Sequence, residues 1–305
     1  MGNIIYVNYI SRFANNIFQY ALAHIIKDLV GGDICFSPKC VIRMGKSHDQ
    51  SVEEVPVEEI PLYQITDSRN ILENKAWSGK FREDEKDALR KTGVRFAEDV
   101  LIFEDGRLTV DRSWRGEPII LAGYYQDYRY YRGRREFVSA LLSDYPAVSL
   151  PGKNDIVLNF RGTDLSWAQM PLSYHRWILD KEKFEKLWIV TEDPTHETVT
   201  GLLKAYPGAV LSNGAVQDFK FVRSARRIVM AVSTCCWMAA WLSEADRIYF
   251  PLGSPYPLFD KDNDRRLIIT DDPRYRYVRP VFDRAIVRKM FPFYREAPVG
   301  SRGNR

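Results

Sequence analysis

The second half of the chain alternates short apolar runs with segments of helical spacing, and this alternation limits the possible fold more than any other feature. Buried strands are predicted at 156–160, 187–191, 210–211, 227–232 and 247–251. Helices are predicted between them at 174–179, 196–206, 218–225 and 236–242. Strands that alternate with helices favour a parallel sheet with helices on both faces. The sequence therefore predicts an α/β fold.

The N-terminal half begins with the same order of elements. An apolar run at 3–9 predicts a strand, and residues 12–16 are polar and turn-like. Helical spacing over 17–29 ends at Gly31-Gly32, which is a typical stop signal. This half therefore also predicts a strand–loop–helix unit with the loop at the carboxyl end of the strand.

The middle of the chain is less regular. Residues 44–117 suggest only mixed loops and short helices, followed by a strand at 119–123 and a helix at 127–142. Two prolines and a glycine between 146 and 153 predict a linker. Two Rossmann-like units that face one cleft, divided near residue 150, are therefore expected.

The composition is that of a globular protein with a mild positive charge. The 305 residues are 45% hydrophobic and 28% charged, which allows a sizeable core, and the net charge is +4. This excess is small for a duplex-binding surface, so no nucleic-acid partner is expected, but it would attract a small anion. No apolar run approaches the roughly 20 residues of a membrane helix, and no basic leader precedes the first strand. A soluble, cytoplasmic protein is expected.

The cysteine, histidine and aspartate patterns predict neither disulfides nor a metal site. The four cysteines, including the adjacent pair Cys235-Cys236, form no disulfide framework, which indicates reduced thiols in the cytosol. No histidine pairs with a cysteine at zinc-ligand spacing. Asp260-Lys-Asp-Asn-Asp264 is similar to the start of a calcium loop, but Arg265 occupies the position that requires glycine. We therefore expect no metal and no cofactor.

The strand at 156–160 delivers polar side chains to its carboxyl end, where α/β folds bind ligands. Arg161 comes first, and its guanidinium fork matches the oxygens of a diphosphate. Gly162 lets the backbone approach a ligand closely, and Asp164 could orient Arg161 or contact a sugar. On this pattern alone, a surface Arg–Asp pair at the end of a strand is the simpler alternative.

The segment Asn159-Phe-Arg-Gly-Thr-Asp164 resembles the H-x-R-R-G/T-D motif of the α-1,2-, α-1,6- and protein O-fucosyltransferases. The resemblance implies that Arg161 binds the diphosphate of GDP-fucose and that Asp164 takes the position of the motif's acid. Asn159 replaces the usual histidine, and Gly162 replaces the second arginine. These departures concern the identity of the donor more than the fold, which the resemblance implies to be of the GT-B type.

Two segments of the N-terminal half also resemble this family. Ser11-Arg-Phe-Ala-Asn-Asn-Ile-Phe-Gln-Tyr-Ala21 resembles the opening G-x-x-G-N-Q-x-F-Q-Y-A of the bacterial α-1,2 enzymes. The resemblance implies that Arg12, Asn15 and Asn16 line the phosphate side of the donor. Residues 121–131 resemble the family's G-Y-x-Q-x-x-x-Y-F segment, although their aromatic residues also suit the start of an amphipathic helix. Taken alone, the first segment would be an ordinary strand–helix turn.

Ile189-Val-Thr-Glu-Asp-Pro194 resembles the strand-ending S/T-D-D-P of the same family. Acids at strand ends commonly contact ribose hydroxyls, so Glu192 is a candidate for that contact.

The segment from Asp218-Phe to Ser233-Thr-Cys-Cys-Trp-Met-Ala-Ala-Trp241 resembles D-F followed by S-S-F-S-W-W-G-A-W. The resemblance implies that Asp218 binds guanine and that Ser233 and Thr234 meet phosphate. A helix N-terminus there would favour an anion, although serine or threonine before a helix is first of all an N-cap. The two tryptophans, spaced i,i+4, are expected to pack in the core.

Together these segments predict an inverting, metal-independent glycosyltransferase that moves a sugar, L-fucose from GDP-fucose, to a glycan hydroxyl in polysaccharide biosynthesis. The expected domains are an N-terminal acceptor-side domain (1–150), a nucleotide-sugar-binding domain (151–280) and a partly disordered extension (281–305). The predicted catalytic residues are Arg161, Asp164 and His175. The predicted donor-binding residues are Arg12, Asn15, Asn16, Asn159, Arg161, Glu192, Asp218, Ser233 and Thr234.

Two other functions stay open at this point. A transferase of the same fold could use another GDP- or UDP-sugar, or a non-catalytic module could bind glycan or nucleic acid. The catalytic base is also open among Asp164, His175 and Glu192, because an acid beside Arg161 should be a poor base. A lipid-linked acceptor would bring the chain to a membrane surface as a peripheral protein.

Overall fold

The fold is seen in a computed structural model. It describes residues 3–8, 13–36, 39–43, 52–56, 81, 83–142, 150–162, 169–212, 215–252 and 267–280.

A parallel sheet of four strands forms the N-terminal half. Its order is β2-β1-β8-β5, and each neighbouring pair is parallel. The strands are β1 (Ile4–Val7), β2 (Asp33–Phe36), β5 (Arg95–Phe96) and β8 (Ile119–Leu121). Helix α1 (Phe13–Val30) connects β1 to β2 and buries its apolar residues against this sheet. The expected strand–helix unit at the N-terminus is therefore present.

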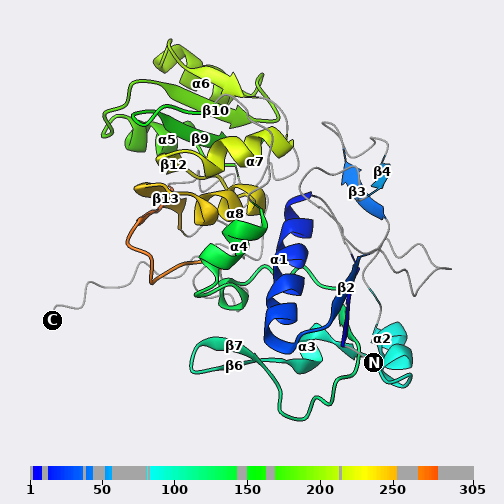
Figure 1. The fold of residues 1–305 in the computed structure, drawn as a ribbon. Coiled ribbons are helices and arrows are strands. Elements are labelled where there is room, and N and C mark those ends of the chain that lie inside the picture. Colours follow the sequence, from blue (N-terminus) through cyan, green and yellow to red (C-terminus); the bar gives the residue numbers. More distant parts are fainter. Residues whose placement is uncertain are drawn as a thin grey trace, which may run out of the picture.

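Smaller elements surround the first sheet (Figure 1). Two antiparallel hairpins pair β3 (Lys39–Arg43) with β4 (Val52–Pro56), and β6 (Leu101–Glu104) with β7 (Arg107–Val110). The short helices are α2 (Glu83–Arg90), α3 (Ala97–Val100), the 3-10 helix η2 (Tyr128–Tyr130) and α4 (Arg135–Leu141).

A parallel sheet of six strands forms the C-terminal half. Its order is β11-β10-β9-β12-β13-β14, and counted in chain order from β9 this is 3-2-1-4-5-6, the Rossmann order. The strands are β9 (Ile156–Phe160), β10 (Leu187–Thr191), β11 (Val210–Ser212), β12 (Arg227–Val229), β13 (Arg247–Pro251) and β14 (Tyr275–Val278). All five neighbouring pairs are parallel.

Helices cover both faces of this second sheet. They are α5 (Leu172–Leu179), α6 (Glu197–Ala205), α7 (Ala215–Arg223) and α8 (Thr234–Leu242). Phe160 contacts the rings of His175 on α5 and His196 before α6, whereas Trp188 contacts Phe221 on α7. Because side chains alternate along a strand, Asn159 and Arg161 lie on the opposite face from Phe160, the face that α7 and α8 cover.

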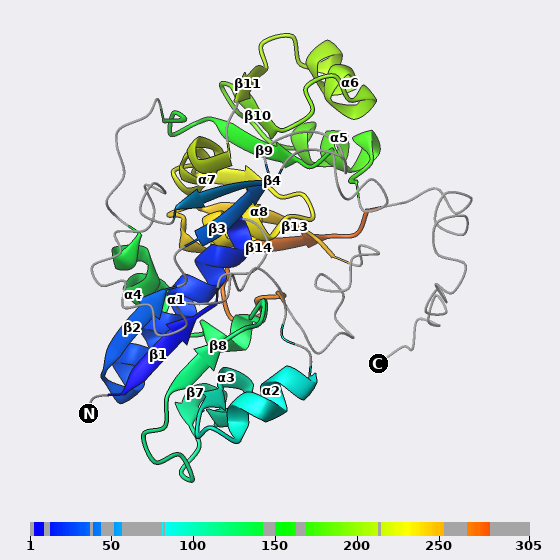
Figure 2. The same cartoon turned by 90° about the vertical axis from the view of Figure 1, so that its right-hand side faces the viewer.

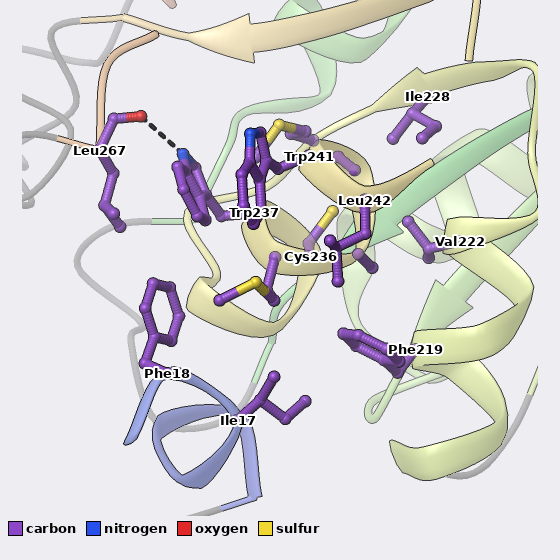
Figure 3. Packing of buried hydrophobic residues seen from close by; sticks show 14 of the residues in the cluster. Ile17, Phe18, Phe219, Val222, Ile228, Cys236, Trp237, Trp241, Leu242 and Leu267 are labelled. Atoms are coloured by element: carbon purple, nitrogen blue, oxygen red, sulfur yellow. Dashed lines mark hydrogen bonds between the residues drawn. The ribbon is translucent and has the colours of Figure 1, made fainter. Parts of the chain in front are cut away.

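The two halves are joined by an aromatic seam between α1 and α8. In Figures 1 and 2, α1, α4 and α8 lie between the two sheets. Figure 3 shows Phe18 of α1 against Trp237 of α8, with ring centroids 5.5 Å apart, and the Trp237 indole N–H donates to the Leu267 carbonyl at 2.6 Å. Trp237 is fully buried and Trp241 nearly so. The prediction that both tryptophans pack in the core is confirmed.

The observed elements confirm the predicted α/β, GT-B-type class of two Rossmann-like units. The cleft between the units and the domain limits stay predictions, and the extension at 281–305 lies outside the described residues. In the part of the chain that the structure describes, no helix is both long and apolar enough to span a bilayer.

Three sequence predictions were wrong in detail. The helix at 127–142 is in fact a 3-10 turn followed by α4, because Gly133 between them has a φ of 72°, which a helix does not allow. Helix α1 begins at Phe13, so Asn15 and Asn16 lie in its first turn and not in a loop. The sequence also did not predict β2, β14 or the strands within 44–117. These strands are only two to five residues long, which is short for an alternating pattern to be recognised.

Candidate functional site

The second sheet has a topological switch point between β9 and β12. The chain leaves β9 for α5 and β10 on one side, and leaves β12 for α8 and β13 on the other. Open α/β sheets bind ligands at this point, beyond the carboxyl ends of the strands. Arg161 and Gly162 follow β9 here, and Ser233 begins α8 after β12. The fold thus brings together two of the segments that the sequence predicted for donor binding.

Arg161 and Glu192 follow neighbouring strands and lie close together. The Arg161 Nε and a Glu192 carboxylate oxygen are 4.0 Å apart, at the outer limit of an ion pair. The two side chains are 23% and 38% exposed, so solvent reaches both. A guanidinium carries several N–H donors, so one that solvent reaches can bind an incoming anion in addition to its protein contacts.

Asp218 of α7 also lies near this pair, as the thiol of Cys235 shows. Burial raises the pKa of Cys235 to about 12, the charge of Arg161 opposes this rise, and the carboxylates of Asp218 and Glu192 add to it. All three charged groups therefore act on one atom in the first turn of α8. The thiol itself stays protonated near neutral pH, so it is not a nucleophile.

Ser233 is the N-cap of α8. It is 4% exposed, its backbone is extended, and its Oγ accepts a hydrogen bond from the Cys236 N–H at 3.3 Å. The cap orients the start of α8, where the first N–H groups have no acceptor within the helix and attract anions. Thr234, the first helical residue, lies at this end. The cap reading of Ser233 is confirmed, and its contact with phosphate stays a prediction.

Asn159 carries a buried acceptor at the same edge. Its Nδ2 donates to the Val190 carbonyl at 3.3 Å, whereas its Oδ1 finds no hydrogen-bond partner among the described residues. A buried oxygen without a donor costs free energy, about 1–3 kcal/mol. A ligand hydroxyl or N–H would recover this free energy.

Gly162 is required by its neighbours. A Cβ at this position would lie 2.9 Å from the Cβ of Asp193 and 3.1 Å from a ring carbon of Phe160. Any larger residue would therefore force the loop to shift. This packing explains why glycine stands where the fucosyltransferase motif has its second arginine.

At the N-terminal sheet, the predicted ligands Asn15 and Asn16 are engaged with other amides. Asn15 accepts a hydrogen bond from Gln126, which follows β8. Asn16 is fully buried and donates to Gln19 at 3.2 Å, and Gln19 donates to the Asn8 carbonyl at 2.7 Å. Asn16 therefore ties the start of α1 to the end of β1, and its contact with the donor stays a prediction.

His175 lies inside the C-terminal half. It is fully buried between Phe160 and Tyr174, and burial lowers its pKa to about 3. A neutral, enclosed imidazole is poorly placed to take a proton from an acceptor hydroxyl. Of the other predicted residues, Arg12 and Asp164 lie outside the described residues.

Two residues that no sequence pattern singled out hold the Arg161 segment. The Gln169 amide donates to the Gly162 carbonyl at 2.7 Å, and its oxygen lies 3.1 Å from Nε2 of His196. His196 was predicted only as the start of a helix, and Gln169 carried no signal, because the contact joins residues 27 positions apart.

Within the described ranges, no group of three or more histidine, cysteine, aspartate or glutamate side chains could hold a metal ion.

Comparison with known proteins finds similarity to solved structures, but not to family models or curated sequences. No protein-family model matches the chain, and no curated protein matches its sequence. Among solved structures, the chain is similar to NodZ α-1,6-fucosyltransferase soaked with GDP-fucose (TM-score 0.47) and to fucosyltransferase NodZ from Bradyrhizobium (TM-score 0.43). Both are 11% identical, over 81% of this chain and 94% of theirs. The fold assignment above depends on strand order alone.

Proposed function

We propose that this chain is a glycosyltransferase that moves a sugar, L-fucose from GDP-fucose, to the hydroxyl of a glycan. One observation carries the proposal: Arg161 and Glu192 lie 4.0 Å apart at the switch point of a Rossmann sheet, and both, with Asp218, lie within electrostatic range of Cys235 in the first turn of α8. The fucosyltransferase motifs assign the positions of Arg161 and Asp218 to diphosphate and guanine, and an acid at a strand end, such as Glu192, commonly contacts ribose. Chain segments far apart in sequence therefore converge where a nucleotide would bind.

Transfer would proceed with inversion. The acceptor hydroxyl attacks the anomeric carbon while GDP leaves from the opposite face, and negative charge grows on the diphosphate. Arg161 and the N-terminal N–H groups of α8 stabilise that charge. A cation and a helix N-terminus can do this without a metal ion, so we expect chelators to leave activity unchanged.

Donor recognition would use groups of opposite polarity. Guanine presents N1–H and an amino group, both donors, and the Asp218 carboxylate accepts from both. The buried Oδ1 of Asn159 would accept a hydrogen bond from a donor hydroxyl or N–H. Glu192 would contact the ribose. We assign deprotonation of the acceptor to Asp164 or Glu192, because His175 is enclosed.

Arg161→Ala provides the test. We expect GDP binding to weaken but to stay measurable by calorimetry, and transfer to fall by about 100- to 1000-fold, the usual cost of removing one group that stabilises the transition state. Arg176→Ala is the matched control, since this exposed arginine of α5 contacts Asp180 at 3.8 Å and Tyr206 and lies outside the predicted site. Near-normal turnover of Arg161→Ala, with Arg176→Ala also active, would exclude this site.

A second candidate keeps the fold and changes the donor. Gly162 leaves the described part of the site without the motif's second cation, which weakens the case for GDP-fucose itself. Thermal-shift measurements with GDP and UDP separate the two: stabilisation by UDP but not by GDP would favour another sugar nucleotide.

Nucleic-acid binding is less favoured by the structure. The arginines of the basic run at 132–135 each pair with a carboxylate: Arg132 with Asp271, Arg134 with Asp28 and Arg135 with Glu244. Arginines committed to bonds between elements offer little charge for a phosphate backbone.

A further inference from the structure

We propose that Gln169 and His196 are positioning residues that fix the backbone on which Arg161 is presented to the diphosphate. This inference rests on the proposed function, because it assigns Arg161 a phosphate ligand. Neither residue belongs to a motif that the sequence suggested.

A directed chain of three hydrogen bonds links the start of α6 to the Arg161 segment. The Thr198 N–H donates to Nδ1 of His196 at 3.1 Å, so Nδ1 carries no proton. The proton of the neutral ring is therefore on Nε2, which donates to Gln169 Oε1 at 3.1 Å. The Gln169 amide then donates to the Gly162 carbonyl at 2.7 Å. Every donor in this chain has an acceptor, and only one orientation of the amide satisfies it.

The same histidine holds Arg161 from its other side. The His196 ring contacts the Phe160 ring, with centroids 4.7 Å apart, and Phe160 directly precedes Arg161. Arg161 thus lies between Phe160, whose ring contacts His196, and Gly162, whose carbonyl accepts a hydrogen bond from Gln169. Asp193 packs against Gly162 as well, at a distance that leaves no room for a Cβ.

The residues that hold the backbone and the side chain of Arg161 lie on opposite faces of the second sheet. His196 and Phe160 lie on the face of α5 and α6, whereas Arg161 extends to the face of α7 and α8, where Glu192 lies. The bond between Gln169 and Gly162 joins two residues seven positions apart in the chain. A backbone held in this way need not be ordered when the ligand binds, which strengthens binding without a direct contact.

Variants of Gln169 test this series of hydrogen bonds and leave the bond by which His196 caps α6 unchanged. Gln169→Leu removes both bonds at similar size. Gln169→Glu keeps an acceptor for His196 but places a carboxylate oxygen against the Gly162 carbonyl. We expect both to raise the Kd for GDP about tenfold, the effect of one lost hydrogen bond of ordinary strength. Asn154→Ala is the control, since it removes a 2.7 Å bond to Glu185 just before β9, at the opposite end of that strand.

Variants of His196 separate positioning from capping. His196→Asn keeps an oxygen that can cap α6 but is too short to reach Gln169, so we expect weaker GDP binding with an unfolding midpoint near that of the wild type. If this variant lowers stability and leaves the Kd unchanged, His196 is only a cap. If a Gln169 variant fails to fold, the Kd of His196→Asn for GDP still shows whether the hydrogen bond between His196 and Gln169 supports nucleotide binding.

The decisive readout is a double-mutant cycle with Arg161→Ala. Because Gln169 acts through Arg161, Gln169→Leu should change the Kd for GDP less than twofold in that background, against about tenfold in the wild type. Equal losses in both backgrounds would show a general structural effect and overturn the proposal. If the wild-type protein binds no nucleotide, the proposed function itself is refuted. If the wild type and Gln169→Leu bind GDP with the same Kd, only the positioning role is refuted.

Discussion

The two parallel sheets present different chemistry at the same structural position. Beyond the carboxyl ends of β9 and β10 lie charged groups, Arg161 and Glu192, whose side chains solvent partly reaches and which lie 4.0 Å apart. Beyond β1 lie amides that are buried and bonded to one another, such as Asn16 and Gln19. Both edges belong to a strand–helix–strand unit, so the backbone alone does not set their chemistry.

The difference indicates a division of tasks. Charges left within reach of solvent can exchange water for a charged ligand, as a diphosphate requires. Amides that satisfy each other inside the protein hold the start of α1 in place, and α1 in turn carries Phe18 against Trp237. In the described residues, the N-terminal edge thus supports the junction between the units, while the C-terminal edge offers the charges.

The junction itself should show the largest effect. Trp237→Ala removes the ring that contacts Phe18 and Trp241, together with its bond to Leu267. We expect the free energy of unfolding to fall by about 3–5 kcal/mol, as for other large residues removed from a core. Urea denaturation measures it. A loss below about 1 kcal/mol would mean that the two units do not stabilise each other through this seam.

Nucleobase recognition should come next and should distinguish the two edges. Asp218→Asn replaces a double acceptor by one acceptor and one donor, so GDP binding should weaken by about 1.5–3 kcal/mol and UDP binding should not change. Gln126→Leu, at the N-terminal edge, breaks an amide pair with Asn15 and should change neither Kd by a comparable amount. Calorimetry with both nucleotides checks this, and equal losses of GDP and UDP would reject the guanine contact.

Acid should weaken both units through one histidine in each, His175, which is buried, and His24, which is half-buried. Burial lowers the pKa of His175 to about 3 and that of His24 to about 4. Both values lie below the ordinary value of about 6.5, so the unfolded chain binds more protons. The stabilisation is therefore complete above about pH 6.5 and is lost as the pH falls towards the folded pKa.

Each histidine should contribute a slope of up to about 1.4 kcal/mol per pH unit to the free energy of unfolding. Urea denaturation between about pH 7 and about pH 5 measures the slope. His175→Leu and His24→Leu should each lower this slope by the part that the replaced histidine contributes. If one of them leaves the slope unchanged, that histidine is solvated in the folded protein.

The cap of α8 should give the smallest effect. Ser233→Ala removes the oxygen that accepts from the Cys236 N–H, and we expect a loss of about 1 kcal/mol in the free energy of unfolding. Ser233→Gly should cost only a few tenths of a kcal/mol, because water can reach the same N–H. If both variants lower GDP affinity equally, Ser233 contacts the nucleotide in addition to capping the helix.

The sequence predicted local features well. The strands β9, β10 and β13 fall where the apolar runs lie, because a buried parallel strand must be apolar on both faces. It also singled out Arg161 and Asp218, because the motif segments that contain them are continuous in the chain. It failed where a backbone conformation interrupts a favourable pattern, as at Gly133.

What the sequence by itself determined is therefore the kind of layers, the positions of the longer elements and the chemical type of the side chains beyond the strand ends. Only the tertiary structure decided the strand order that brings Arg161 next to the start of α8, and the burial that withdraws Asn16 and His175 from solvent. It also decided the bonds that join His196 and Gln169 to Gly162. These features depend on contacts between residues far apart in the chain, and short-range periodicity carries no record of such contacts.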